Sequence, residues 1–407
     1  MVTRSSIIAI LAKISEWAVY IIIFVLPFSK SLIEIAAVTA IVSLISKKIL
    51  AKESLLGHTH VDILLYIFIF ANLFSFINTA HLSLSLRALF SKTLEYAVLF
   101  LIVKEVINTK EKLRNFLIIA AVSCTVILID GFIQYYITHI DLLHAYPSFR
   151  YVQAVPDFLG VPTASFPYPN DFASWIFIFI FPTCVLAIFG FRDITKRVFF
   201  SFVCSALLFS LYLTKVRGAW AAFLLTFALL TIFKLKKIGL IILVALFLAI
   251  LVMHSSLMPY IMAKTSINDR MEMWRNGWEI FERHPIIGNG LNTFFVHYRE
   301  VRDDAYKNKR GSYAHNCYLQ MASDIGLVGL VSFFLFAFAV IAAGIKATRA
   351  ITEPFYNSLI MGTTFGLIAF LLHAAVDTNL YSLNLAVLFW MTAGILMASI
   401  RVCREGL

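Results

Sequence analysis

The sequence predicts an all-α, polytopic membrane protein with about 12 transmembrane helices. Of the 407 residues, 60% are hydrophobic and only 14% are charged, and the mean hydropathy is +0.86. A soluble protein carries about 25% charged residues, so a soluble globular fold is excluded. Long apolar segments also recur along the chain with short polar segments between them, as expected of helices that cross a bilayer repeatedly.

Each expected span is an apolar segment close to the length of about 20 residues that a bilayer requires. In chain order these segments are residues 5–27, 31–46, 61–79, 86–103, 114–138, 169–190, 197–214, 218–233, 238–253, 324–345, 355–375 and 381–401. The second is short, and the first contains Lys13 and Glu16. The spans divide the chain into N-terminal transmembrane helices (1–138), a first long loop (139–168), central transmembrane helices (169–253), a second long loop (254–323) and C-terminal transmembrane helices (324–407).

Basic residues predict the orientation of the chain. If the spans alternate, most loop lysines and arginines fall on one side, including Lys47, Lys48, Lys110, Lys112, Arg192, Lys196, Lys236, Lys346 and Arg401. Positively charged loops face the cytoplasm, so both termini are expected there and the two long loops outside. The net charge of +11 then reflects topology and attraction to anionic lipids. Nucleic-acid binding is disfavoured because the basic residues are spread over short loops.

The second long loop is expected to form a helical lid over the outer face. Asn268 or Asp269 is a candidate N-cap, and His284–Pro285 is a candidate end of the same helix. Apolar residues recur at a spacing of three to four, namely Met271, Trp274, Trp278 and Phe281. A glycine-rich turn at 288–290 precedes a second short helix within 291–300. This pattern predicts an amphipathic lid that lies on the bilayer surface.

Basic residues on the outer face are candidate ligands of an anion. Lys215 and Arg217 stand at the outer end of a span, against the positive-inside bias. A guanidinium there suits bidentate capture of phosphate, although a snorkelling arginine that marks the boundary is the alternative. Arg270 is placed at the start of the lid helix, where the helix dipole also favours an anion. Arg275 either joins this site or belongs to a solvated polar face.

His315 is the candidate general base. It stands where the long polar loop re-enters an apolar helix, and a histidine side chain titrates near pH 6.5. The alternative is an interfacial histidine that caps the helix or bonds to a carbonyl. Asn316 follows directly, and Asp377 stands four residues after His373 at the outer end of a later span. Asp377 could orient an imidazole, bind sugar hydroxyls or simply cap a helix. Separately, the Gly326–Gly329 pair in the following helix predicts close helix packing.

No sequence pattern indicates a metal or cofactor. HExxH, paired CxxC and EF-hand motifs do not occur. Four of the five cysteines fall in or beside spans, and only Cys317 lies near the outer face. No structural disulfide is therefore predicted.

Taken together, these segments resemble the O-antigen ligase and polymerase superfamily of membrane glycosyltransferases over roughly residues 160–400. The matching motifs, in order, are Thr214-x-x-Arg217, Arg270-Met-Glu-Met-Trp274, His284-Pro285-Ile-Ile-Gly288-Asn-Gly290, His315-Asn316-Cys-Tyr-Leu319 and Gly326-Leu-Val-Gly329. In the same family an arginine often precedes Pro–Asn. Here Pro169–Asn170 is present but the nearest arginine, Arg150, is farther away than in the family, so its role stays open.

The resemblance implies a fold of the GT-C type with a large periplasmic loop between spans 9 and 10. It also implies metal-independent transfer of a glycan from undecaprenyl diphosphate, in the inner membrane and on the periplasmic side. Carried over by position, Arg217 and Arg270 would bind the diphosphate and His315 would deprotonate or orient the acceptor hydroxyl. Asp377 matches an acidic position of the family. Asn316, Arg275 and Lys215 are further candidates for support, and whether Arg275 and Lys215 join the site stays open. No metal or cofactor would be needed.

Three functions remain open from the sequence. The favoured one is an O-antigen ligase, whose acceptor is the lipid A–core oligosaccharide. The second is an O-antigen polymerase, which joins lipid-linked repeats and shares the same motifs. The third is a transporter of polyprenyl-linked sugars, which predicts charges at mid-membrane in several spans. Here the charged residues collect at the outer boundary instead, which favours chemistry at that surface. The glycan, the acceptor hydroxyl and the roles of His284 and His373 stay undecided.

Overall fold

The computed structural model describes residues 3–144, 160–236, 239, 264–302 and 313–404. Within these ranges all regular secondary structure is helical and no strand occurs, so the all-α prediction is confirmed. The first half of the described chain comprises α1 (Arg4–Val25), α2 (Lys30–Ala51), α3 (His60–Phe74), η1 (Ser75–Ile77), α4 (Leu82–Ala88), η2 (Leu89–Leu94), α5 (Glu95–Val106), α6 (Lys110–Ile133) and η3 (Gln134–Thr138).

The second half contains the remaining spans and the lid. Its elements are α7 (Pro169–Val185), η4 (Leu186–Gly190), α8 (Ile194–Leu213), α9 (Arg217–Leu235), α11 (Lys264–Arg283), α12 (Phe294–Val301), α13 (Cys317–Ala350), α14 (Pro354–Ala374), η6 (Asn379–Tyr381) and α15 (Leu383–Arg404). Proline begins two of these helices, at Pro169 and Pro354. Proline suits the first helical position because its missing N–H would have no partner there.

Nine helices in the described part of the chain are long and apolar enough to cross a membrane. They are Arg4–Val25, His60–Ile77, Lys110–Thr138, Pro169–Gly190, Ile194–Leu213, Arg217–Leu235, Cys317–Ala350, Pro354–Ala374 and Leu383–Arg404. The expected spans 31–46 and 86–103 are also helical, but α2 and the α4–η2–α5 stretch carry more charge. The expected span 238–253 lies almost wholly outside the described residues. The chain is therefore a multi-pass membrane protein, while the count of 12 and the GT-C loop stay predictions.

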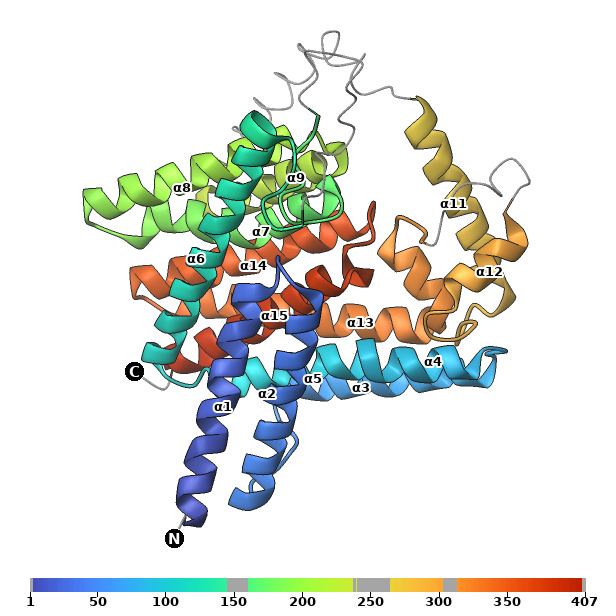
Figure 1. Ribbon diagram of the computed structural model, residues 1–407, viewed down its shortest axis with the longest axis horizontal. Coiled ribbons are helices and arrows are strands. Elements are labelled where there is room, and N and C mark those ends of the chain that lie inside the picture. The colour runs from blue at the N-terminus through green and yellow to red at the C-terminus, as the bar shows by residue number, and fades with distance from the viewer. Residues whose placement is uncertain (1–2, 145–159, 237–238, 240–263, 303–312, 405–407) are drawn as a thin grey trace.

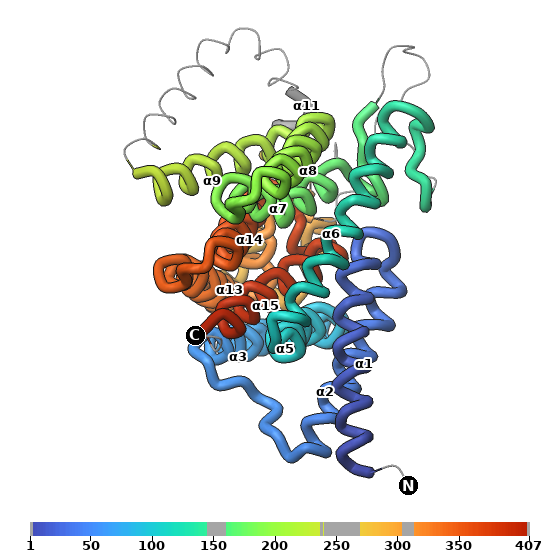
Figure 2. The backbone as a smooth tube through the Cα atoms, turned by 90° about the vertical axis from the view of Figure 1, so that its left-hand side faces the viewer, coloured from blue at the N-terminus to red at the C-terminus, as the bar shows by residue number. Residues whose placement is uncertain are grey.

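The helices form three layers, which Figures 1 and 2 show from two directions. One layer contains α7, α8 and α9, the middle one α13, α14 and α15, and the third α3 and α5. The helices α1, α2 and α6 run steeply across the direction of the others. The middle layer is the core of the protein. In α15, 89% of an apolar stretch of 18 residues is buried inside the protein. The lid helices α11 and α12 lie at one end of the layers, beside the start of α13 (Figure 1).

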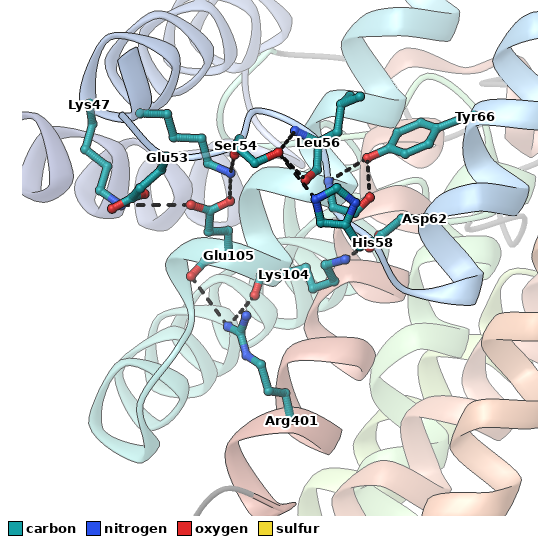
Figure 3. Close-up of polar contacts among 12 residues, drawn as sticks. Lys47, Glu53, Ser54, Leu56, His58, Asp62, Tyr66, Lys104, Glu105 and Arg401 are labelled. Carbon is teal, nitrogen blue, oxygen red and sulfur yellow. Dashed lines mark hydrogen bonds and ion pairs between the residues drawn. The ribbon is translucent and has the colours of Figure 1, made fainter. Parts of the chain in front are cut away.

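Charged residues tie the layers together at the end opposite the lid (Figure 3). Lys104 forms an ion pair with the fully buried Asp62 at the start of α3. Glu105 pairs with Lys48 of α2 at 2.5 Å. Arg401 of α15 donates to the Lys104 carbonyl at 2.6 Å. These contacts join α2, α3, α5 and α15 at a single point, which fixes this end of the bundle.

The lid is fixed to the bundle through backbone atoms. Gly326 breaks α13 with φ +66° and ψ −173°, which exposes main-chain groups that a continuous helix would bond internally. At this break the Leu327 and Val328 amides donate to the carbonyls of Pro285 and Ile286, at 2.8 and 3.0 Å. In return, the Gly290 amide of the lid donates to the Asp324 carbonyl at 2.9 Å. These main-chain hydrogen bonds therefore dock the turn after α11 onto the break in α13.

Only glycine fits on either side of this contact. A Cβ atom at Gly326 would lie 2.3 Å from the Ile286 carbonyl oxygen, and one at Gly288 would lie 2.3 Å from the Asp324 carbonyl oxygen. Both glycines also have a positive φ, which side chains disfavour. The prediction that the Gly326–Gly329 pair packs two helices is therefore wrong. Gly326 instead interrupts a helix so that the lid backbone can approach.

The lid helix differs from the prediction in its start and in its buried face. It begins at Lys264, so neither Asn268 nor Asp269 is the N-cap, although its end at Arg283 agrees with the His284–Pro285 signal. Met271 and Trp278 are 61% and 55% exposed, against the predicted apolar stripe. The buried face instead carries Asn276, Gly277, Ile280 and Phe281. Gly277 allows α11 to approach Leu319 of α13 closely, so the lid packs on the protein as well as facing outward.

Candidate active site

The segment before α13 holds His315 in an unusual backbone conformation. Asn316 is the N-cap of α13, and its side chain accepts from the amides of Tyr318 and Leu319 at 3.0 and 3.1 Å. The capping role that was an alternative for His315 therefore belongs to Asn316. His315 itself has a φ of +48°, which is uncommon for a residue with a side chain.

Asp377 lies directly opposite His315, in the connection between α14 and α15. The Asp377 backbone carbonyl accepts from both the amide and the Sγ of Cys317, at 3.2 and 3.1 Å. These two bonds hold the connection against the start of α13. The Asp377 carboxylate then lies 3.6 Å from His315 Nδ1, measured from Oδ1. The imidazole is 38% exposed, whereas the carboxylate is 3% exposed, so one side of the pair is open to a ligand.

The Asp377 carboxyl stays ionised although it is buried. Burial by itself raises its pKa, but the neighbouring His315, His373 and Asn170 side chains reverse this and hold the pKa below its ordinary value. A permanent negative charge beside Nδ1 favours the tautomer with the proton on Nδ1. The His315 Nε2 is then the nitrogen that can accept a proton.

His373 connects this pair to the start of α9. The side chain is buried at 1% exposure, and its Nδ1 shares a 2.8 Å hydrogen bond with Ser174 Oγ of α7. The opposite edge of the ring faces Gly218, where a Cβ atom would lie 3.7 Å from His373 Nε2 and 2.8 Å from Val376 Cγ2. Glycine at 218 thus lets the first turn of α9 rest against the end of α14. Arg217 is the first residue of that turn.

Arg217 and Arg270 come from different elements but lie near each other. Arg217 is exposed at the start of α9. Arg270 lies in the second turn of α11, and not at the helix terminus as the sequence predicted. Burial lowers the pKa of Arg270, and so does the nearby Arg217, whereas Asp377 acts in the opposite direction. Both arginines remain cations in a protein, so the site contains two positive charges beside one carboxylate.

The remaining predicted residues are less central. Lys215 is exposed two residues before Arg217, with a φ of +52°. Arg275 is exposed and pairs with Glu272 of its own helix at 2.8 Å, which fits a solvated lid face. His284 is exposed at the end of α11. Arg150 lies outside the described residues.

Two polar residues at the start of α7 also reach this site, and the sequence reasoning missed them. Asn170 lies beside the Asp377 carboxylate and lowers its pKa. Asp171 is 8% exposed and lies within electrostatic range of Asp377 and Lys30. The available signal was the run Pro169–Asn170–Asp171 at the outer end of an apolar span. It was read as an ordinary helix start, because asparagine and aspartate are common there.

Chemically, this arrangement combines an anion site with a base. Two guanidinium groups can hold the oxygens of a phosphate or diphosphate by charge-assisted hydrogen bonds. The first turn of α9 adds main-chain amides and the positive end of a helix dipole. The exposed edge of His315 can take a proton from a hydroxyl placed beside that anion.

Comparison with known proteins gives a match to one family model. A family model described as O-antigen ligase matches residues 200–334, a segment that runs from α8 into α13 and includes Arg217, Arg270 and His315. Asp377 and His373 lie beyond the matched segment. No curated protein matched the sequence. The match over these residues supports the assignment made from the motifs to the O-antigen ligase superfamily, whose members are membrane glycosyltransferase-like ligases and polymerases.

Proposed function

We propose that the protein is an O-antigen ligase. It transfers a glycan from undecaprenyl diphosphate to the lipid A–core oligosaccharide at the periplasmic face of the inner membrane, without a metal and with inversion at the anomeric carbon. The family supports a lipid-linked glycan and a lipid A–core partner in general terms. The juxtaposition of Arg217, Arg270, Asp377 and His315 is the observation that carries the proposed reaction.

In this reaction Arg217 and Arg270 bind the diphosphate of the donor. The bond between the anomeric carbon and the phosphate oxygen breaks, and the pair of electrons stays on the departing undecaprenyl diphosphate. The arginines neutralise the negative charge that develops there. Charge stabilisation by groups already in place is commonly the largest contribution to catalysis. A diphosphate is a good leaving group, so no strong general acid is required.

His315 acts on the acceptor. The hydroxyl oxygen of the acceptor sugar forms the new bond to the anomeric carbon, and its proton passes to His315 Nε2. Asp377 keeps the proton on His315 Nδ1 and stabilises the imidazolium that results. The two side chains, 3.6 Å apart, are sufficient for this step. The proton then leaves to water through the exposed edge of the ring.

An experiment on the His315→Ala variant tests this function and distinguishes it from polymerisation. The variant is expressed in cells that lack the native enzyme, and lipopolysaccharide is analysed on a gel. For a ligase, we expect bare lipid A–core together with accumulated lipid-linked polymer. For a polymerase, the core would carry a single repeat instead.

The His284→Ala variant is the matched control. It removes an exposed histidine at the end of α11, in the same lid but outside the site, and should keep the full ladder of glycan lengths. If the His315→Ala cells also show a full ladder while the protein is present at normal amount, His315 is not the catalytic base. A transporter is indicated if lipid-linked glycan accumulates on the cytoplasmic side of the membrane.

A further inference from the structure

The connection between α14 and α15, which carries Asp377, borders a second region of the protein through Leu380 and Tyr381. Here the side chains enclose a cavity of about 80 Å³, a volume that holds about half a dozen water molecules. The cavity lies between α3, α5, α13 and α15, with η2 and η6 completing its walls. Among the described residues that line the cavity, none belongs to α9 or α11, the helices that carry Arg217 and Arg270.

The cavity has an aromatic floor. Phe68, Phe333 and Trp390 meet there, with the Phe68 ring 5.7 Å from Phe333 and 6.1 Å from Trp390, the latter nearly parallel. Aromatic side chains give an apolar contact surface for the C–H face of a pyranose ring, whereas the ring edges of a sugar carry hydroxyls. A floor of this type gives contact area without demanding a hydrogen bond from the ligand.

Hydrogen-bonding side chains stand around the cavity. Lys92 brings the only charge among the described lining residues, and its Nζ donates to Asn292 Oδ1 of the lid at 2.8 Å. Tyr96 and Tyr381 add phenol groups. An ammonium has three donors, so Lys92 can bond a ligand while it holds the lid. Ammonium, amide and phenol groups beside an aromatic floor form a set that suits sugar hydroxyls.

The cavity also adjoins the proposed base. The ring of Tyr381 lines the cavity and lies 6.5 Å from the ring of Tyr313, two residues before His315. Tyr381 belongs to the same connection as Asp377, four residues further on. A ligand in the cavity would thus contact a side chain that packs beside the segment carrying His315.

We propose that this cavity binds a sugar ring of the acceptor glycan, an inference that rests on the proposed transfer reaction. Inverting displacement requires the incoming hydroxyl to approach the anomeric carbon from the side opposite the leaving group. The diphosphate is assigned to the arginines of α9 and α11, so the acceptor needs a separate place near His315. The cavity adjoins the segment that carries His315 and has the chemistry to hold a sugar there.

A cavity-filling variant tests this site. Ala88 lines the cavity and is 3% exposed, so Ala88→Leu places three additional carbon atoms in the space. The measurement is glycan transfer in proteoliposomes, with purified lipid-linked glycan as donor and purified lipid A–core as acceptor. We expect the KM for the acceptor to rise at least tenfold, with the KM for the donor unchanged.

Ala71→Leu is the matched control. It makes the same change on α3, but Ala71 lines an apolar groove between α3 and α13 instead of the cavity. The acceptor KM of this variant should equal that of the wild type. If Ala88→Leu leaves the acceptor KM unchanged, or if both variants raise it equally, the cavity is only a packing void and the inference is wrong. A wild-type protein that transfers no glycan at all would refute the proposed function itself.

Tyr381→Phe provides a test that does not depend on tolerance of a larger side chain. It removes one hydroxyl and keeps the ring that packs beside Tyr313. We expect a severalfold rise in acceptor KM and an unchanged donor KM. An unchanged acceptor KM for Tyr381→Phe, together with an Ala88→Leu protein that fails to fold, would count against a sugar site in this cavity.

Discussion

Replacement of Asp377 by asparagine isolates the charge beside the proposed base. The fold of this region depends on the Asp377 backbone carbonyl, which binds Cys317, and asparagine leaves that carbonyl in place. What the variant loses is the carboxylate 3.6 Å from His315 Nδ1. At an effective dielectric constant of about 20, a pair of charges at this separation interacts by about 4–5 kcal/mol.

This energy must be reduced before it is converted to a rate. The His315 side chain is 38% exposed, and screening by water leaves about 2–3 kcal/mol. At about 1.4 kcal/mol for each factor of ten, the kcat of Asp377→Asn should fall about 100-fold. The donor KM should not rise, because Asp377 partly neutralises the nearby Arg270 and its removal cannot weaken the hold on an anion.

The assay is glycan transfer in proteoliposomes at pH 7, with single and double variants compared. If Asp377 acts through His315, the His315→Ala/Asp377→Asn protein should lose no more activity than His315→Ala alone, since residues that act as a unit are not additive. A kcat of Asp377→Asn within threefold of the wild type would refute the coupling. Independent, multiplicative losses in the double variant would assign Asp377 a separate role.

Four further outcomes follow from the same geometry. Arg217→Lys keeps the charge but loses the planar fork, and we expect transfer to fall at least tenfold with normal membrane insertion, as measured by activity per amount of inserted protein. Gly326→Ala places a Cβ 2.3 Å from the Ile286 carbonyl oxygen and should cost at least about 2 kcal/mol, seen as a lower Tm in detergent. Asn316→Ala removes the N-cap of α13 and should cost about 1 kcal/mol by the same measurement. The pKa of Asp377 in the folded protein is depressed below its ordinary value of 3.8. The ionised carboxylate therefore stabilises the folded protein above that pH, and this stabilisation is lost as the pH falls below it. The Tm difference between the wild type and Asp377→Asn should accordingly shrink in strong acid.

The helices could be predicted from the sequence because they depend on local properties. Apolar length and flanking charge determine a span, so nearly all the expected segments are helical where the structure describes them. The break at Gly326 could not be read in the same way. A glycine inside an apolar helix usually indicates close packing, and only the position of the lid backbone shows that this one interrupts the helix. The start of α11 was misplaced because Asn268 and Asp269 resemble caps but lie within a helix.

The cations and the imidazole of the proposed site could be named from the sequence, whereas their supporting residues were less visible. Arg217, Arg270 and His315 stand in motifs with a recognisable order, and the structure places Arg270 near both Arg217 and Asp377, while Asp377 faces His315. The contribution of Asn170 depends on how α7 packs against α14, which no local pattern indicates. His373 was visible as a histidine four residues before Asp377, but only its contacts with Ser174 and Gly218 show which way each edge of the ring points.

The way in which the lid is attached has a consequence for how such enzymes diversify. The turn after α11 meets α13 mainly through peptide groups, with glycines at the points of closest approach. Peptide groups are common to all residues, so the attachment tolerates exchange of the exposed lid side chains as long as Gly277, Gly288, Asn289 and Gly326 are kept. Lids from related proteins could then be exchanged at this attachment, which would allow glycan preference to be changed by grafting while Arg270 stays aligned with α9.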